Sequence, residues 1–379
     1  MRGFLKCFGK TKSSFRSKRQ QISQTSQGLD DDHDHHNNNK VLAEPEDSIT
    51  CSSIVVRKFS WEEIEKFTKN FCSSRVIGYG GFSTVYLAGD LIPSTTSTGT
   101  NLAAIKIING SRLFKQELDI LRQLHHRNIV GLIGYCDDRD DQWALVLDYI
   151  SNGGLEDKLH GGVGETSTTT TLPWRNRKAI ALQVAEALEY LHEMCGGLPI
   201  VHGDIKASNV LLDHHLNCRL CDFGSANIGF SSAVTPGMRP NRAVMMGSPG
   251  YTDPHYLRTG LPSKKNDVYS FGVLLLELVT GMQAFCSESN RTLVSRVGPT
   301  FGRDDVDIAE LVDPRLAGEF EAEEARALLS LSAECLRQPP TLRPSASQIL
   351  QALNDNVSFI PPSIQHTYHG SKNLLTLQK

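Results

Sequence analysis

The residues best suited to chemistry in this sequence lie between His202 and Asp222. Asp204 could accept a proton from a hydroxyl group, and Lys206 could hold an anionic group during its transfer. Asn209 and Asp222 carry hard oxygen atoms, which magnesium takes as ligands alongside phosphates. In phosphoryl transfer a protein acts mainly by positioning the reactants and neutralising charge. This set of side chains therefore favours phosphoryl transfer, with Asp204 as the proton acceptor.

A glycine-rich stretch and a lysine in an apolar run precede this loop. Gly78, Gly80 and Gly81 alone would indicate a tight turn more often than a phosphate site, because glycine is the usual residue at unusual backbone angles. Lys106 alone would be a surface lysine. However, the β-rich run 103–108 that carries Lys106 follows the glycines along the chain, and a glycine hairpin lets backbone amides approach phosphates closely. Their order therefore favours nucleotide binding.

The segments around these residues predict two lobes. Runs rich in β-branched and aromatic residues at 76–86, 103–108 and 143–149 indicate strands. Apolar residues recur at helical spacing over 114–124 and place Glu117 near the buried face of a helix. The first lobe is therefore expected to be small and β-rich.

The chain beyond residue 154 is expected to be largely helical. A helix with one apolar face over 180–191 leads into the loop that carries Asp204. Residues 267–281 predict a helix that is apolar nearly all round and ends at Gly281, and such a helix belongs in the middle of a lobe. The polar loops then lie at the junction of the two lobes, where ligand clefts tend to form.

Composition and charge exclude several classes of protein. The 379 residues, 39% of them hydrophobic, suffice for roughly two domains of ~150 residues. A net charge of −3 gives no overall basic field, so no nucleic-acid partner is expected. The longest apolar run, 273–279, is far shorter than the ~20 residues of a membrane-spanning helix. The nine cysteines show no disulfide spacing, which favours a reducing cytosol.

Cys218 and Cys221 form the one closely spaced pair of cysteines in the sequence. A zinc or redox site is one interpretation, and two small core residues in a short strand is the other. The second is favoured, because no further pair stands at zinc-ligand spacing.

Residues 1–57 predict a disordered N-terminal arm that is first basic and then acidic. The first 29 residues hold seven lysines and arginines and no acid, and four aspartates follow by residue 34. A lipid on Cys7, together with these basic residues, would suffice for stable contact with a membrane surface. An uncommitted disordered tail is the alternative. No signal peptide or myristoylation pattern is recognised.

In chain order, these motifs resemble the eukaryotic protein kinase family over residues 59–354. Segments 59–64, 126–136 and 267–272 are similar to the plant receptor-like cytoplasmic kinases in particular, of the non-RD type in the receptor-like/Pelle group. The resemblance implies a cytoplasmic protein, and one peripheral at the plasma membrane if the arm binds lipid.

The family resemblance also implies a fold and its boundaries. The fold class is α+β, the bilobal protein kinase fold with a small β-rich N-lobe and a larger, mainly helical C-lobe. The N-lobe is expected over 58–150 and the C-lobe over 151–357, with a C-terminal tail over 358–379.

The resemblance further implies an ATP- and Mg²⁺-dependent serine/threonine protein kinase in receptor-linked signalling. Protein substrates are expected, and a membrane receptor kinase is a candidate partner. Asp204 is then the base, Lys206 contacts the transferred phosphate, and Lys106 contacts the α- and β-phosphates while pairing with Glu117. Asn209 and Asp222 are the metal ligands. The other nucleotide-binding residues implied are Ile77, Gly78, Tyr79, Gly80, Gly81, Phe82, Ser83, Thr84, Val85, Ala104, Leu147, Asp148, Tyr149 and Ile150.

Gly203 departs from the family pattern, because an arginine is expected beside the catalytic aspartate. In many kinases that arginine pairs with a phosphorylated activation loop, which glycine cannot do. Activity is therefore expected not to depend on phosphorylation of this loop, whose candidate sites are Ser231, Ser232, Thr235, Ser248 and Thr252. Ser83, in place of the third glycine of the phosphate loop, is a milder departure.

His255 is the second marked departure, because the family has a glutamate there that pairs with the arginine matched by Arg343. An unpaired buried arginine would cost ~3–5 kcal/mol of stability. Some compensation is therefore required, and His255→Glu is expected to raise the melting temperature.

Two other functions remain as alternatives. A pseudokinase scaffold would bind signalling partners without efficient phosphoryl transfer, and Gly203 and His255 favour it. Pseudokinases usually lose residues of the Lys106, Asp204 or Asp222 type, however, and all three are present. A small-molecule kinase is weaker still, because segment 250–254 resembles the peptide-binding segment of protein kinases.

Overall fold

The computed structural model describes residues 56–89, 102–161, 171–194, 197–229, 247–301, 303, 305 and 307–357. All of them belong to one compact unit. Residues 1–55 of the expected arm, with Cys7, lie outside the described residues, as do the C-terminal tail and Ser231, Ser232 and Thr235. The arm ends earlier than expected, because Arg57 already belongs to a strand. Within these ranges, no helix is both long and apolar enough to cross a membrane.

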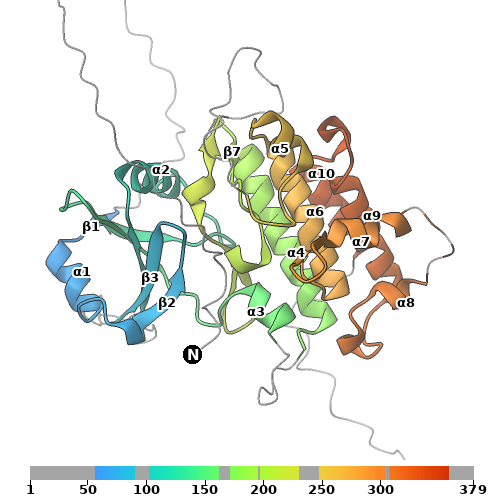
Figure 1. Cartoon of the computed structure of the whole chain (residues 1–379), viewed down its shortest axis with the longest axis horizontal. Coiled ribbons are helices and arrows are strands. Elements are labelled where there is room, and N and C mark those ends of the chain that lie inside the picture. The colour runs from blue at the N-terminus through green and yellow to red at the C-terminus, as the bar shows by residue number, and fades with distance from the viewer. Residues whose placement is uncertain are drawn as a thin grey trace, which may run out of the picture. The chain divides into compact units, whose positions relative to one another are not determined.

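The smaller lobe is built on a six-stranded sheet (Figure 1). Its spatial order is β1-β5-β6-β4-β3-β2, and neighbouring strands are antiparallel except for β1, which runs parallel to β5. In chain order the strands are β1 (Arg57–Lys58), β2 (Val76–Tyr79), β3 (Ser83–Ala88), β4 (Ala103–Ile108), β5 (Leu132–Cys136) and β6 (Trp143–Asp148).

Successive side chains along β4 point to opposite faces of the sheet, so one face packs in the core and the other carries Lys106. Ile105 and Ile107 belong to a core cluster on one face of the sheet, whereas Lys106 points to the other face, where it meets α2 (Ser111–Leu121). The cluster is covered by α1 (Trp61–Phe67), which contributes Trp61, Ile64 and Phe67. Because β4 lies inside the sheet, the position of Lys106 is fixed on both sides by strand pairing.

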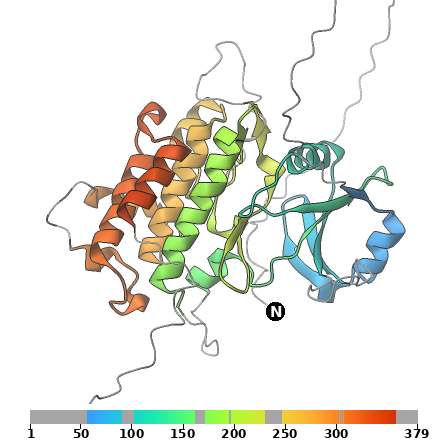
Figure 2. The ribbon, with the colours of Figure 1, turned by 180° about the vertical axis from the view of Figure 1, so that it is seen from behind.

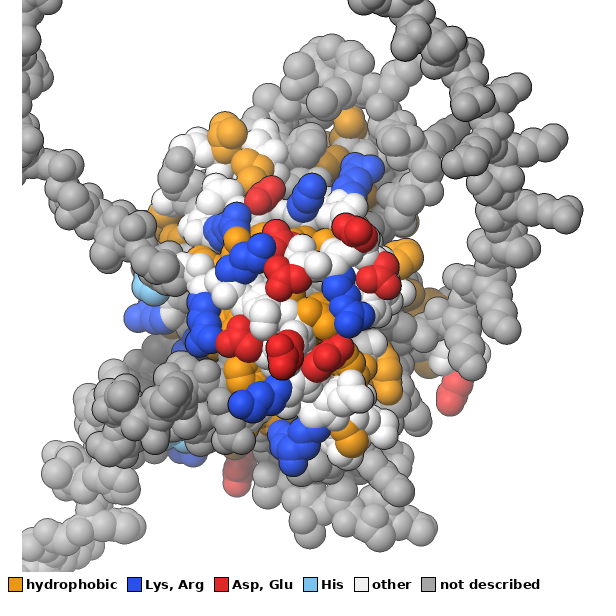
Figure 3. All heavy atoms as spheres, turned by 90° about the vertical axis from the view of Figure 1, so that its left-hand side faces the viewer, with side chains coloured by type: hydrophobic (Ala, Val, Ile, Leu, Met, Phe, Trp, Pro, Cys, Tyr) orange, Lys and Arg blue, Asp and Glu red, His pale blue; other side chains and the backbone are white. Residues whose placement is uncertain are grey.

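The N-terminus of α1 is formed by a capping box, in which Ser60 and Glu63 each satisfy the other's backbone N–H. The face of the lobe on which α1 lies carries acidic and basic side chains interleaved (Figure 3). Lys58 contacts Asp137 at 2.8 Å. This face therefore offers no continuous basic surface.

The larger lobe is mainly helical (Figures 1 and 2). Its central helix α6 buries every residue from Asp267 to Thr280 and ends at Gly281, which has a left-handed backbone. The expected C-terminus is thus confirmed, and the helix begins at Lys264, three residues earlier than predicted. The helices are α3 (Leu155–His160), α4 (Trp174–Glu189), α5 (Pro254–Thr259), α6 (Lys264–Thr280), α7 (Leu293–Val297), α8 (Ile308–Leu311), α9 (Ala322–Cys335) and α10 (Ala346–Asn356).

Short strand pairs place the loops at the edge of this lobe. β7 (Ile200–Val201) pairs with β10 (Asn227–Ile228), and β8 (Val210–Leu212) pairs with β9 (Cys218–Leu220). The loop that carries Asp204 therefore runs between β7 and β8, and Asp222 lies two residues after the end of β9. A further pair, β11 (Phe285–Cys286) with β12 (Arg291–Thr292), lies beyond α6.

Candidate active site

The loop that carries Asp204 is held from below by the central helix. The backbone N–H groups of His202 and Gly203 each donate to the carboxylate of Asp267 at 2.8 Å. His192 approaches the same carboxylate at 2.9 Å. Asp267 is 1% exposed. It therefore supports the loop and does not face a reactant.

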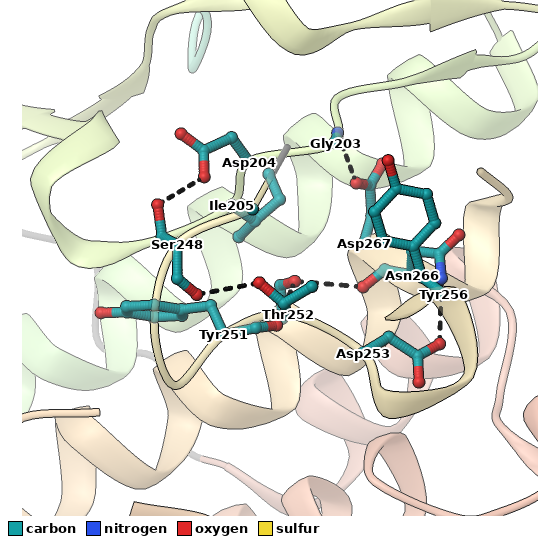
Figure 4. A pocket seen from close by; sticks show the side chains of 12 residues that line it. Gly203, Asp204, Ile205, Ser248, Tyr251, Thr252, Asp253, Tyr256, Asn266 and Asp267 are labelled. Carbon is teal, nitrogen blue, oxygen red and sulfur yellow. Dashed lines mark hydrogen bonds between the residues drawn. The ribbon is translucent and has the colours of Figure 1, made fainter. Parts of the chain in front are cut away.

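Asp204 lies among groups that can hold a hydroxyl and a phosphate. Lys206 Nζ is 2.7 Å from Asp204 Oδ2, and the Ser248 hydroxyl donates to Asp204 Oδ1 at 2.8 Å. Figure 4 shows the Ser248 contact in a pocket that Gly203 and Tyr256 also line. A carboxylate oriented in this way can accept a proton, with an ammonium group beside it to neutralise negative charge.

Asn209 and Asp222 are brought side by side through the backbone. The N–H of Cys221 donates to the carbonyl of Asn209 at 2.9 Å, and Asp222 is the next residue. The Asn209 amide nitrogen donates to the backbone and side chain of Asp204, at 2.8 and 3.1 Å. This contact directs the amide oxygen away from Asp204. One amide oxygen and one carboxylate are therefore carried on adjoining segments, a donor set that fits Mg²⁺.

Asp222 is held in this place by its backbone and its neighbour. Its φ of 65° lies in the left-handed region. Phe223 is fully buried and packs edge-on against the His202 ring, with centroids 4.7 Å apart. A strained backbone of this kind persists only where packing determines it.

Lys106 joins the two lobes through a pair of carboxylates. Its ammonium group lies 2.7 and 2.8 Å from the two oxygens of Glu117 and 2.8 Å from Asp222 Oδ1. Burial disfavours the ammonium form, but the two carboxylates outweigh it and raise the pKa of Lys106. The charge of Lys106 in turn lowers the pKa of Asp222 to about 2. Lys106 and Asp222 are therefore charged at neutral pH, whereas burial raises the pKa of Glu117 against the opposing effect of the Lys106 ammonium.

The residues expected to bind the nucleotide lie around this cluster. The hairpin of β2 and β3 closes with Gly80 N–H donating to Ser83 O at 2.7 Å, and a Cβ at Gly80 would overlap the Ser83 hydroxyl. Ala104 and Leu147 are direct cross-strand partners, and Ala104 shares the β4 face of Lys106. A side chain at Gly80 would therefore require the Ser83 hydroxyl to turn away.

The carboxylate of Asp148 is turned away from the expected nucleotide. It accepts from Arg219 at 2.9 Å and from the N–H of Gly131 at 3.1 Å. Only the backbone of Asp148 remains for the expected contact with adenine. Tyr149 and Ile150 continue the chain from this point toward the larger lobe.

Comparison with known proteins agrees with this geometry. The protein kinase domain profile matches residues 71–353. The chain belongs to the protein kinase family. Salt tolerance receptor-like cytoplasmic kinase 1 of Oryza sativa subsp. japonica is 45% identical over 335 residues, which cover 86% of this chain and 89% of that protein.

Two further relatives come from Arabidopsis thaliana. A probable receptor-like protein kinase is 46% identical over 310 residues, which cover 78% of this chain and 86% of the relative. A probable LRR receptor-like serine/threonine-protein kinase is 37% identical over 304 residues, 80% of this chain but 33% of the relative. The chain is therefore a plant receptor-like cytoplasmic kinase, as the motifs predicted.

Ser248 and Tyr251 are site residues of this kinase that the sequence did not assign to catalysis. Ser248 appeared only as a candidate phosphorylation site, yet its hydroxyl lies between Asp204 and Lys206, 2.9 Å from the Lys206 ammonium. The Tyr251 hydroxyl donates to Glu277 and accepts from the N–H of Ala207 at 3.1 Å. The sequence signal that could have pointed to Tyr251 was the resemblance of segment 250–254 to the peptide-binding segment of protein kinases.

Ser248→Ala is expected to lower kcat about tenfold to a hundredfold, because hydrogen bonds to charged groups contribute about 1.5–3 kcal/mol. Ser248→Thr keeps the hydroxyl and should retain most of the activity. Steady-state assays would compare both with Ser295→Ala, which alters an exposed hydroxyl on α7. Equal rates for Ser248→Ala and the Ser295 control would contradict this role.

Gly203 has a backbone that favours glycine, with φ at +80°. A Cβ there would lie 2.8 Å from the carbonyl oxygen of Ser225, so an arginine would need the neighbouring backbone to move. The loop is instead held through Asp267, which needs no phosphate. This arrangement keeps the expectation that loop phosphorylation is dispensable.

Replacing Ser231, Ser232 and Thr235 together with alanine is expected to leave kcat within about twofold of the wild type, because no arginine at 203 awaits a phosphate. Ser248 and Thr252 must remain, since Ser248 contacts Asp204 and the Thr252 hydroxyl donates to the Ser248 carbonyl. The measurement is kcat before and after phosphatase treatment. Loss of activity in a folded triple variant would refute the expectation.

Arg343 shows what compensates for His255. It is 2% exposed, and its guanidinium binds both carboxylate oxygens of Asp253, at 2.6 and 3.0 Å. This partner was not predicted from the sequence. Because Arg343 is already paired, the reason for expecting His255→Glu alone to raise the melting temperature no longer holds.

Cys218 and Cys221 are consistent with the core interpretation. Both are free thiols, Cys218 is buried on β9, and burial raises the pKa of each. In the described residues no group of three or more histidine, cysteine or acidic side chains could hold a metal ion. A zinc site at this pair is therefore not supported.

Proposed function

We propose that this protein transfers the γ-phosphate of ATP to serine or threonine hydroxyls of protein substrates in receptor-linked signalling. The observation that carries the proposal is the charged cluster of Lys106, Glu117 and Asp222 beside the oriented Asp204. Bound ATP with Mg²⁺ would supply the phosphate and neutralise its charge. Lys106 would hold the phosphates, and Asn209 and Asp222 would hold the metal.

The groups around Asp204 suit the proton transfer that this reaction needs. A substrate hydroxyl that donates to Asp204 beside Ser248 would lie within reach of Lys206 as well, because Lys206 contacts both Asp204 and Ser248. Asp204 would accept the hydroxyl proton as the oxygen attacks, and Lys206 would steady the transferred group. A lysine in this place supports the serine/threonine assignment, which the names of relatives also suggest.

The test is transfer of labelled phosphate from ATP to a generic protein substrate in the presence of Mg²⁺. The Asp204→Asn protein, purified in parallel, serves as the blank for contaminating kinases. Hydrolysis of the product should release phosphoserine or phosphothreonine. ATP binding without transfer above this blank would favour the pseudokinase scaffold, and phosphotyrosine alone would overturn the substrate class.

A further inference from the structure

The ion pair between Asp253 and Arg343 is among the most completely buried polar features of the larger lobe. Both side chains are 0% exposed. The guanidinium and carboxylate meet through two parallel hydrogen bonds, the strongest geometry that this pair can adopt. Arg343 also donates to the carbonyls of Arg337 and Lys265, both at 2.8 Å. Asp253 thus supplies the carboxylate that the buried guanidinium contacts.

Asp253 also lies where the substrate-facing segment meets the helices. Its carboxylate caps α5 by accepting from the N–H of His255 at 2.8 Å, and it accepts from Asn266 at 2.9 Å (Figure 4). Asn266 precedes Asp267, which holds the catalytic loop. One carboxylate therefore connects α5, the start of α6 and Arg343.

The segment that ends at Asp253 makes the contacts closest to the reaction. Ser248 and Tyr251 touch Asp204 and Ala207, respectively. A shift at Asp253 would therefore be transmitted to the place where a protein substrate must lie. The nucleotide cluster around Lys106 has no direct contact with Asp253 and would be affected much less.

We propose that Asp253 is the positioning residue for the protein substrate in this chain. It replaces, as the partner of Arg343, the glutamate that the family has at position 255. The inference rests on the proposed kinase function for its kinetic consequence alone. The geometry allows both arrangements, because the Asp253 oxygen that binds the His255 N–H is also the one that Arg343 Nη2 contacts at 3.0 Å. A glutamate at 255 would thus start within reach of the guanidinium.

The test moves the carboxylate from one position to the other. Asp253→Ser keeps an N-cap but removes the charge, His255→Glu adds a second carboxylate, and the double variant relocates it. Asp253→Ser is expected to lower the melting temperature by about 6–15 °C. It should raise KM for a protein substrate about tenfold, with KM for ATP within about twofold of the wild type. The double variant should recover most of both losses.

The matched control is Asp307→Ser, the same change at the exposed N-cap of α8. It should alter neither KM and lower the melting temperature by no more than a few degrees. If Asp253→Ser does not fold, Asp253→Asn keeps the shape of the side chain without its charge, and the double variant is measured against it.

Three results would overturn the inference. They are an unchanged KM for protein in Asp253→Ser, an equal rise in both KM values, and a double variant no more stable than Asp253→Ser. If the wild-type protein transfers no phosphate, the proposed function fails, and the melting temperatures of the same four proteins still decide whether the ion pair has been relocated.

Discussion

Replacing Asp204 with asparagine is expected to lower kcat about 10²–10⁴-fold, the usual contribution of a positioned general base. Asparagine keeps the size of the side chain and can still contact Ser248, but it cannot take the proton of a substrate hydroxyl. The residues around Lys106 lie apart from this change, so ATP affinity should stay within about threefold of the wild type. Rates and ATP dissociation constants would be measured on the same preparations.

The control for this change is Asp213→Asn, in the turn between β8 and β9. Asp213 accepts from the N–H groups of His215 and Asn217 and stands away from the reacting groups. The Asp213 variant should keep the wild-type kcat. Equal residual rates in the two variants would show that Asp204 is not the base. Lost ATP binding in Asp204→Asn would show that the substitution disturbed the fold of the site.

Lys106→Met is expected to lower kcat/KM for ATP about 10²–10³-fold, as removal of an oriented donor to developing charge does in other sites. Methionine fills the space of the lysine stem but leaves Glu117 and Asp222 facing each other without a cation. The negative charge of the pair would then repel phosphates. We expect weaker ATP binding as well as slower transfer, in contrast to Asp204→Asn.

Lys115→Met provides the comparison, because Lys115 is an exposed lysine on α2, the helix that carries Glu117. It should leave both kcat/KM and ATP affinity unchanged. An ATP dissociation constant that stays at the wild-type value in Lys106→Met would contradict the assigned phosphate contact. Thermal unfolding in parallel would show whether the loss arises from an unfolded N-lobe.

The parts of the site predicted from sequence are those fixed by local pattern. Lys106 could be placed because alternation along a strand predicts which face of the sheet its side chain lies on. Glu117 could be placed because helical spacing predicts which face of the helix carries it. The two then meet at 2.7 Å. The loop with Asp204 could be placed because an apolar helix precedes it and another follows.

The contacts that the sequence did not reveal join distant segments. From the sequence, His255 leaves Arg343 without its family partner, and the pairing with Asp253 depends on how the first turn of α5 is oriented. Ser248 reaches Asp204 across 44 positions of the chain. Neither contact leaves a periodic signal, because each depends on the path of a loop and not on the repeat of a helix or strand.

The N-lobe of this chain includes ordered residues that precede the range matched by the family profile. The family profile begins at residue 71, whereas β1 begins at Arg57 and joins the edge of the sheet beside β5. Trp61, Ile64 and Phe67 belong to the same buried cluster as Ile105 on β4. A fragment cut at the family boundary would leave that apolar face in water. The segment that precedes the family profile is thus also a part of the hydrophobic core of the N-lobe.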